Sequence, residues 1–182
     1  MAILGEVTFE LQHFQASDGA LRIVGRWHGM RVRGFTRSTA DCPHVDEFFH
    51  GDDKAAFAAG LDYLVAVLPN TQGTHRIVDR SMLDALPSHA VVVNAGRGDT
   101  LDLDALVSAL NQHRLAAAVL DVFPEEPLPA DHVLWRTPRV YITSHTAAPS
   151  FPADIVAVFA ENYRRFARGE KLAHTVDFVR GY

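Results

Sequence analysis

Short apolar runs alternate along the chain with segments in which apolar positions recur every three or four residues. The runs have the length of buried strands, and the segments between them have the spacing of amphipathic helices. The predicted strands lie at about residues 30–35, 62–68, 90–93, 116–120 and 140–142, and the predicted helices at about 52–59, 81–86, 102–111 and 152–168. This alternation predicts an α/β fold with a doubly wound parallel sheet, because helices that join parallel strands cover both faces of the sheet.

The length and composition predict one domain over residues 1–182. A single domain commonly has about 100–200 residues, and no internal repeat or low-complexity linker divides this chain. Hydrophobic residues make up 48% and charged residues 21%, which is the balance of an ordinary globular domain. Residues 152–182 are expected to form a C-terminal helix and tail.

Charge and cysteine content narrow the possible partners and the location. A net charge of −5 disfavours nucleic acid as a partner. No apolar run approaches the roughly 20 residues that cross a membrane, and residues 1–5 do not resemble a signal peptide, so no membrane partner is expected. Cys42 is the single cysteine, which fits a reducing compartment, and the predicted location is the cytoplasm. Helix-spaced histidine ligands are lacking, so no metal site is predicted.

Polar or glycine residues follow each predicted strand from residue 30 onward. In a parallel sheet of this type, ligands bind beyond the carboxyl ends of the strands, so these residues are the candidates for a site. They are Thr36, Arg37 and Ser38 after the first of these strands; Pro69, Asn70 and Thr71 after the next; then Asn94 to Gly98, Asp121, and Thr143 to Thr146.

Three residues near the predicted strand ends have the chemical groups that hydride transfer to a 2-oxoacid requires. Arg97 offers a planar fork of donors to a carboxylate, and His145 could exchange a proton with the carbonyl oxygen. Glu126, placed near His145, would favour the imidazolium form and fix its tautomer. Taken singly, each also has a plain structural reading, namely a surface arginine, a solvated histidine and a loop carboxylate.

Ordered motifs across residues 64–148 resemble the D-isomer-specific 2-hydroxyacid dehydrogenases, most closely those of the glyoxylate/hydroxypyruvate reductase A type. The matching pieces are LVAVLPNT (64–71), VVVNAGRGDTLDLDALVSAL (91–110), LDVFPEEPLP (120–129), LW (134–135) and ITSHTAA (142–148). The resemblance implies an oxidoreductase that uses NAD(P)H to reduce 2-oxoacids similar to glyoxylate and hydroxypyruvate to 2-hydroxyacids. It also implies a homodimer.

The resemblance assigns roles to the strand-end residues. It makes Arg97 the arginine that orients the substrate, Glu126 the acid paired with the histidine, and His145 the proton donor or acceptor. Asp121 matches the aspartate that faces the nicotinamide carboxamide. The loop residues expected to line the cofactor are Asn70, Thr71, Ala95 and Gly96, with Pro69 and Asn94 beside them in the strand-end set.

The end of the predicted strand at 30–35 bears on the choice of cofactor. A site for NAD usually has an acidic residue here, which accepts hydrogen bonds from the ribose 2′-hydroxyl. This chain has Thr36, Arg37 and Ser38, a cation beside hydroxyls, which suits a 2′-phosphate. NADP(H) is therefore favoured, and NAD(H) stays possible.

Two departures from the family qualify these expectations. Gly5 ends a predicted first strand, but Val7 and Glu10 stand where the phosphate-binding fingerprint needs glycines, so residues 1–26 are expected to form a degenerate phosphate-loop region. The substrate domain of the family is missing from the sequence, and its closure excludes water from the site. We therefore expect weak or no activity from this chain alone, and the alternative function is a non-catalytic remnant of the fold that acts as a binding or interaction module.

Overall fold

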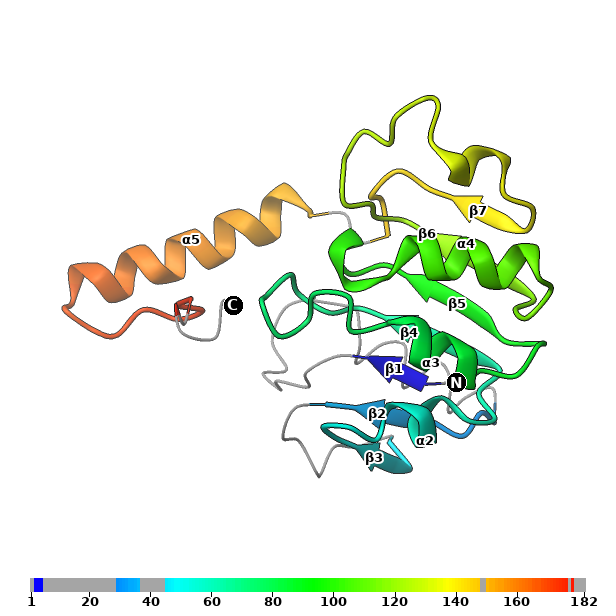
Figure 1. Ribbon diagram of the computed structural model, residues 1–182. Helices are drawn as coiled ribbons and strands as arrows, with labels where there is room; N and C mark the ends of the chain where they lie inside the picture. Colours follow the sequence, from blue (N-terminus) through cyan, green and yellow to red (C-terminus); the bar gives the residue numbers. More distant parts are fainter. Residues whose placement is uncertain (1, 5–28, 37–44, 148–149, 177, 179–182) are drawn as a thin grey trace.

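The computed structural model describes residues 2–4, 29–36, 45–147, 150–176 and 178 (Figure 1). In that part of the chain a seven-stranded sheet has the order β3-β2-β1-β4-β5-β6-β7, and all neighbouring strands are parallel. The strands are β1 (Ala2–Leu4), β2 (Arg33–Phe35), β3 (Glu47–Phe49), β4 (Tyr63–Ala66), β5 (Val91–Asn94), β6 (Ala117–Leu120) and β7 (Val140–Ile142). The order reverses direction between β1 and β4, as in a doubly wound dinucleotide-binding sheet, so the predicted fold class is confirmed.

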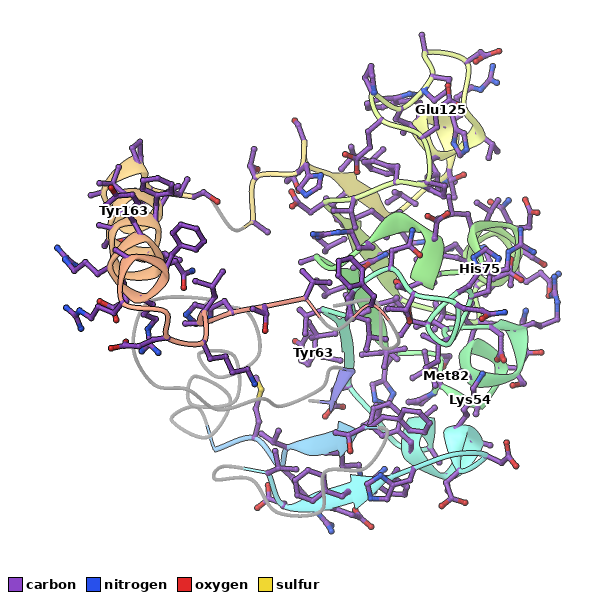
Figure 2. The ribbon with its side chains drawn as sticks, turned by 90° about the vertical axis from the view of Figure 1, so that its left-hand side faces the viewer. Lys54, Tyr63, His75, Met82, Glu125 and Tyr163 are labelled. Atoms are coloured by element: carbon purple, nitrogen blue, oxygen red, sulfur yellow. The ribbon has the colours of Figure 1, made fainter. Side chains whose placement is uncertain are left out.

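Three short helices pack on one face of this sheet: α2 (Lys54–Ala58), α3 (Arg80–Ala85) and α4 (Leu103–Asn111). Figure 2 shows Lys54 and Met82, from α2 and α3, on the same side of the sheet. An aspartate side chain begins two of these helices, since Asp79 accepts a hydrogen bond from the Met82 amide and Asp102 accepts one from the Ala105 amide. Such caps satisfy backbone donors that have no partner within the helix.

The core lies between these helices and the strands. Leu106 and Leu110 of α4 are fully buried against it, as their helical spacing predicts. Near β2 and β3, the Phe57 ring of α2 contacts two other rings. Its centroid lies 5.2 Å from that of Phe35 and 5.7 Å from that of Phe49. These buried apolar contacts attach the helices to the sheet.

The helix α5 (Pro152–Ala167) stands apart from the sheet (Figure 1). None of its residues is buried, and Phe159 and Phe166 are 70% and 74% exposed. Figure 2 shows Tyr163 on this helix, on the opposite side of the sheet from Met82. The chain then turns back along α5, and the Asn162 side chain holds it through both the amide and the carbonyl of Ala173. In the described part of the chain, no helix is long and apolar enough to cross a membrane.

The structure adds one strand that the sequence pattern does not predict. β3 has three residues, too few to show a periodicity, and it exists through its pairing with β2, where Phe35 lies opposite Phe49. In the C-terminal tail, Phe178 is 95% exposed. Gly5, Arg37 and Ser38 lie outside the described residues, so their predicted contacts with the cofactor stay predictions. The same holds for the division of residues 1–182 into one domain.

Candidate active site

The hydrogen-bond ladder of the sheet continues one residue beyond three of its strands. The Ala95 amide donates to the Ala66 carbonyl, the Asp121 amide to the Asn94 carbonyl, and the Thr143 amide to the Leu120 carbonyl, at 3.0, 2.9 and 3.0 Å. Because each bond joins neighbouring strands, the loops after β4, β5, β6 and β7 start side by side at one edge of the sheet. This edge is where the sequence predicts the site.

Glycines on both sides of Arg97 let its loop fit between two others. A Cβ atom on Gly96 would lie 2.6 Å from the Leu68 nitrogen, and one on Gly98 would overlap the main chain of Phe123. Any other residue at these two positions would push the three loops apart. The glycines therefore set Arg97, which is exposed, between the loop after β4 and the loop after β6.

Two side chains fix the main chain of Arg97. The Asn94 side chain is buried, donates to the Arg97 carbonyl at 3.1 Å and accepts from the Gly96 amide at 3.2 Å. The Thr100 hydroxyl donates to the same Arg97 carbonyl at 2.7 Å. The guanidinium donates from Nη1 to the Gly96 carbonyl at 2.7 Å, so one arm of the fork is anchored to its own loop.

The loop after β4 is a compact turn tied to the Arg97 loop. The Thr74 hydroxyl donates to the Pro69 carbonyl at 2.6 Å and accepts from the Thr71 amide at 2.8 Å. The exposed Asn70 side chain donates to Asp99 at 2.7 Å, across to the next loop. The residues predicted to line the cofactor, from Pro69 to Thr71 and from Asn94 to Gly96, thus form adjoining loops at the same edge.

Asp121, directly after β6, organises the loop that follows β7. Its carboxylate accepts hydrogen bonds from the Thr143 hydroxyl, from the Thr146 amide at 3.0 Å and from the Ala147 amide at 2.9 Å. The side chain is only 5% exposed, and burial by itself would raise its pKa. The three hydrogen bonds and the nearby His145 outweigh burial and hold the pKa of Asp121 below its ordinary value, so the group is an anion.

His145 and Glu126 form a direct pair at this edge. The Nδ1 atom of His145 lies 2.8 Å from a Glu126 oxygen, and the other Glu126 oxygen accepts from the Phe123 amide at 2.8 Å. Chiefly the hydrogen bond with His145, and then the one from Phe123, lower the pKa of Glu126. His145 has a φ of 56°, in the left-handed region that is uncommon for residues other than glycine.

The structure therefore brings most of the predicted residues to one place. Glu126 and His145 are in contact, Asp121 holds the loop of His145, and the Arg97 loop packs through Gly98 against the residues that precede Glu126. Sequence reasoning included Thr143 among the strand-end candidates but missed that its hydroxyl donates to Asp121. It also missed that Gly98 has no room for a side chain. Both depend on which strands are neighbours, which the sequence pattern alone does not specify.

We expect that Gly98→Ala destabilises the fold, because its methyl group would overlap the main chain of Phe123 and Pro124. Forcing extra volume into a packed site costs about 1–3 kcal/mol in the free energy of unfolding. Gly73→Ala is the matched control, since the nearest atom to its Cβ, the Thr71 hydroxyl oxygen, is 4.0 Å away, and its change should stay within about 0.5 kcal/mol. Urea unfolding of both variants measures the difference, and equal stabilities would show that the Arg97 loop does not contact the loop after β6.

The pairing of Glu126 with His145 also makes a prediction about pH. The pKa of Glu126 is lowered in the fold, so the stabilisation from this pair is complete above the ordinary pKa of 4.5 and is lost as the pH falls through the lowered pKa. In His145→Ala the pKa of Glu126 should rise toward 4.5, though not fully, because the Phe123 amide still donates.

A carboxyl ¹³C NMR titration measures this pKa in both proteins. His89→Ala is the control, because His89 pairs with Asp62 before β4, at the opposite edge of the sheet. An unchanged Glu126 titration in His145→Ala would show that the pair does not form in solution.

Comparison with known proteins identifies the family of this chain. A family model described as "D-isomer specific 2-hydroxyacid dehydrogenase, NAD binding domain" matches residues 21–147. The chain is 38% identical over 154 residues to a glyoxylate/hydroxypyruvate reductase A of Escherichia fergusonii, an alignment that covers 85% of this chain and 49% of the relative. The chain thus spans about half the length of the curated relatives it matches.

Solved structures share the fold. A D-isomer specific 2-hydroxyacid dehydrogenase from Xanthobacter autotrophicus Py2, in complex with NADPH and MES, superimposes with a TM-score of 0.87 at 33% identity, covering 100% of this chain and 72% of that one. An NADPH-dependent glyoxylate/hydroxypyruvate reductase from Sinorhizobium meliloti, in complex with NADP and sulfate, also gives 0.87, at 28% identity, covering 100% of this chain and 56% of that one. The resemblance in the sequence motifs is thereby confirmed, and this chain belongs to the D-isomer-specific 2-hydroxyacid dehydrogenase family.

Proposed function

We propose that this chain carries the cofactor-binding and proton-transferring part of an NADPH-dependent reductase of small 2-oxoacids such as glyoxylate and hydroxypyruvate. The observation that carries the proposal is the contact of 2.8 Å between His145 and Glu126, at the sheet edge that also presents Arg97. The relatives' names support the reaction, because the curated relatives are glyoxylate/hydroxypyruvate reductases.

His145 is proposed as the proton donor to the carbonyl oxygen. Its Nδ1 faces the Glu126 carboxylate, which stabilises the imidazolium and leaves Nε2 as the ring atom that gives its proton to substrate. After the proton leaves, the neutral ring keeps its remaining proton on Nδ1, and Glu126 accepts a hydrogen bond from this N–H group. Glu126 in turn accepts a hydrogen bond from the Phe123 amide, so the ring and the carboxylate keep their relative position.

Arg97 is proposed to bind the substrate carboxylate. A guanidinium presents a planar fork that matches the two oxygens of a carboxylate. Its main chain is fixed by Asn94 and Thr100, so the side chain starts from a set position. Binding the carboxylate at this loop would leave the adjacent carbonyl of a 2-oxoacid toward the loops after β6 and β7.

The Asp121 carboxylate fits contact with a nicotinamide cofactor. Bound NADPH supplies the hydride that reduces the carbonyl carbon. An ionised carboxylate has about four acceptor positions, and three donors use those of Asp121, which leaves one for the amide group of a nicotinamide. The preference for NADP(H) over NAD(H) rests on Arg37 and Ser38, together with the two solved relatives that hold NADPH or NADP.

A second candidate function is a non-catalytic binding module of the same fold. The exposed apolar face of α5 favours it, because Phe159 and Phe166 would be covered by a partner rather than by this chain. The weak or absent activity expected of this chain alone, its cytoplasmic location and its homodimer all stay predictions.

The first test of the proposed function is cofactor binding. Ligand at about 100 times its Kd stabilises the folded state by about 2.7 kcal/mol, which raises the melting temperature of a chain of this size by about 5–10 °C. We expect millimolar NADPH to produce such a shift and NADH a smaller one. No shift with either cofactor would contradict the proposed function and favour the binding module.

The second part of the same test concerns Arg97, in the chain saturated with NADPH. Oxamate, an analogue of a 2-oxoacid, should shift the NMR signals of the His145 ring, and Arg97→Lys should weaken its binding about tenfold or more, because lysine keeps the charge and loses the fork. Arg136→Lys, at an exposed arginine before β7, is the control and should leave binding unchanged. Equal oxamate affinity in the Arg97 variant would exclude the proposed role of Arg97.

A further inference from the structure

We propose that Thr143 is a positioning residue for His145, which acts through the carboxylate of Asp121. The inference rests on the proposed function, because the position of His145 matters to the reaction only if His145 is the proton donor. Its structural content stands on contacts that link the first residue after β7 to the first residue after β6.

The loop from Thr143 to Ala147 wraps around Asp121. The Thr143 hydroxyl and the Thr146 amide both donate to Oδ1 of Asp121, and the Ala147 amide donates to Oδ2. On the main chain, the His145 amide donates to the Asp121 carbonyl at 2.7 Å. Four donors on one short loop therefore converge on a single residue, and His145 lies in the middle of that loop.

The conformation of His145 depends on this wrapping. A residue other than glycine keeps a φ of 56° only where its surroundings fix the backbone. Hydrogen bonds from Thr143 before it and from Thr146 and Ala147 after it fix the loop on both sides. This backbone conformation is the one in which Nδ1 of the ring meets Glu126.

Thr143 contributes the only side-chain donor among the described contacts of the Asp121 carboxylate. Asp121 is nearly fully buried, so water does not readily replace a donor that is removed. Without the hydroxyl, Oδ1 keeps only the Thr146 amide and Oδ2 only the Ala147 amide, so the carboxylate holds the loop less firmly. His145 would then lose its fixed orientation toward Glu126, although neither Thr143 nor Asp121 touches its ring in the described contacts.

The test compares Thr143→Val, which removes the hydroxyl and keeps the shape, with Thr143→Ser, which keeps the hydroxyl. Thr137→Val is the matched control, because the Thr137 hydroxyl donates to the Val133 carbonyl before β7, at the far end of that strand. Two quantities are measured by NMR on this chain without cofactor. One is the exchange rate of the His145, Thr146 and Ala147 amide hydrogens, and the other is the ¹⁵N signature of the His145 ring at alkaline pH, which shows which nitrogen carries the proton.

We expect Thr143→Val to speed exchange of these amides about tenfold or more, as loss of a hydrogen bond to a charged group predicts. The ring should move from the Nδ1–H form toward the Nε2–H form of free histidine, and Thr143→Ser and Thr137→Val should both keep the original ring signature. An unchanged ring in Thr143→Val, with or without faster exchange, overturns the inference, and so does a changed ring in Thr143→Ser. Should Thr143→Val fail to fold, Thr143→Ala removes the same hydroxyl and should change the ring signature in the same way, and an unchanged ring in that variant overturns the inference. Because no cofactor is used, failure here is distinct from failure of the NADPH titration.

Discussion

The carboxylate of Asp121 is the interaction on which the arrangement of the strand-end loops depends. Burial disfavours its charge, and three hydrogen-bond donors from the loop after β7 restore it. A buried carboxylate with too few hydrogen-bond donors destabilises the fold, so the conformation in which the loop supplies these donors is favoured. The same loop carries His145, whose place beside Glu126 is therefore a consequence of satisfying Asp121.

In the Arg97 loop, close contacts between main-chain segments set the arrangement, and no buried charge is involved in these contacts. Gly96 lies against the loop after β4, and Gly98 lies against the loop after β6. Arg97 is therefore held between the loops of two strands that are not neighbours of each other. The ladder bonds that continue past the strands add the alignment along the sheet. The site thus combines an arginine loop, fixed by close contact and by hydrogen bonds from Asn94 and Thr100, with a histidine loop fixed by hydrogen bonds to Asp121. The proposed hydride transfer needs both groups in constant relative position.

The sequence predicted much of this arrangement because its signals are local. The apolar run at residues 90–93 predicted the strand β5, and the helical spacing of Leu106 and Leu110 predicted the helix α4. The motifs around Arg97 and His145 identified the family. What it did not predict depends on pairing between distant segments. β3 is a strand because β2 lies beside it, and the Thr143 hydroxyl matters because β6 and β7 are neighbours. Such contacts join residues that are 14 to 22 positions apart, and no periodicity marks them.

The most direct test of the account is the pKa of Asp121 in the folded chain, measured by the titration of its carboxyl carbon in ¹³C NMR. The two opposing effects give opposite results, since burial alone raises this pKa and the three donors lower it. The account predicts a value below the ordinary 3.8, with the signals of the Thr146 and Ala147 amides changing over the same pH range. A value above 3.8 would show that the donors do not hold the carboxylate, and the explanation for the placement of His145 would be wrong.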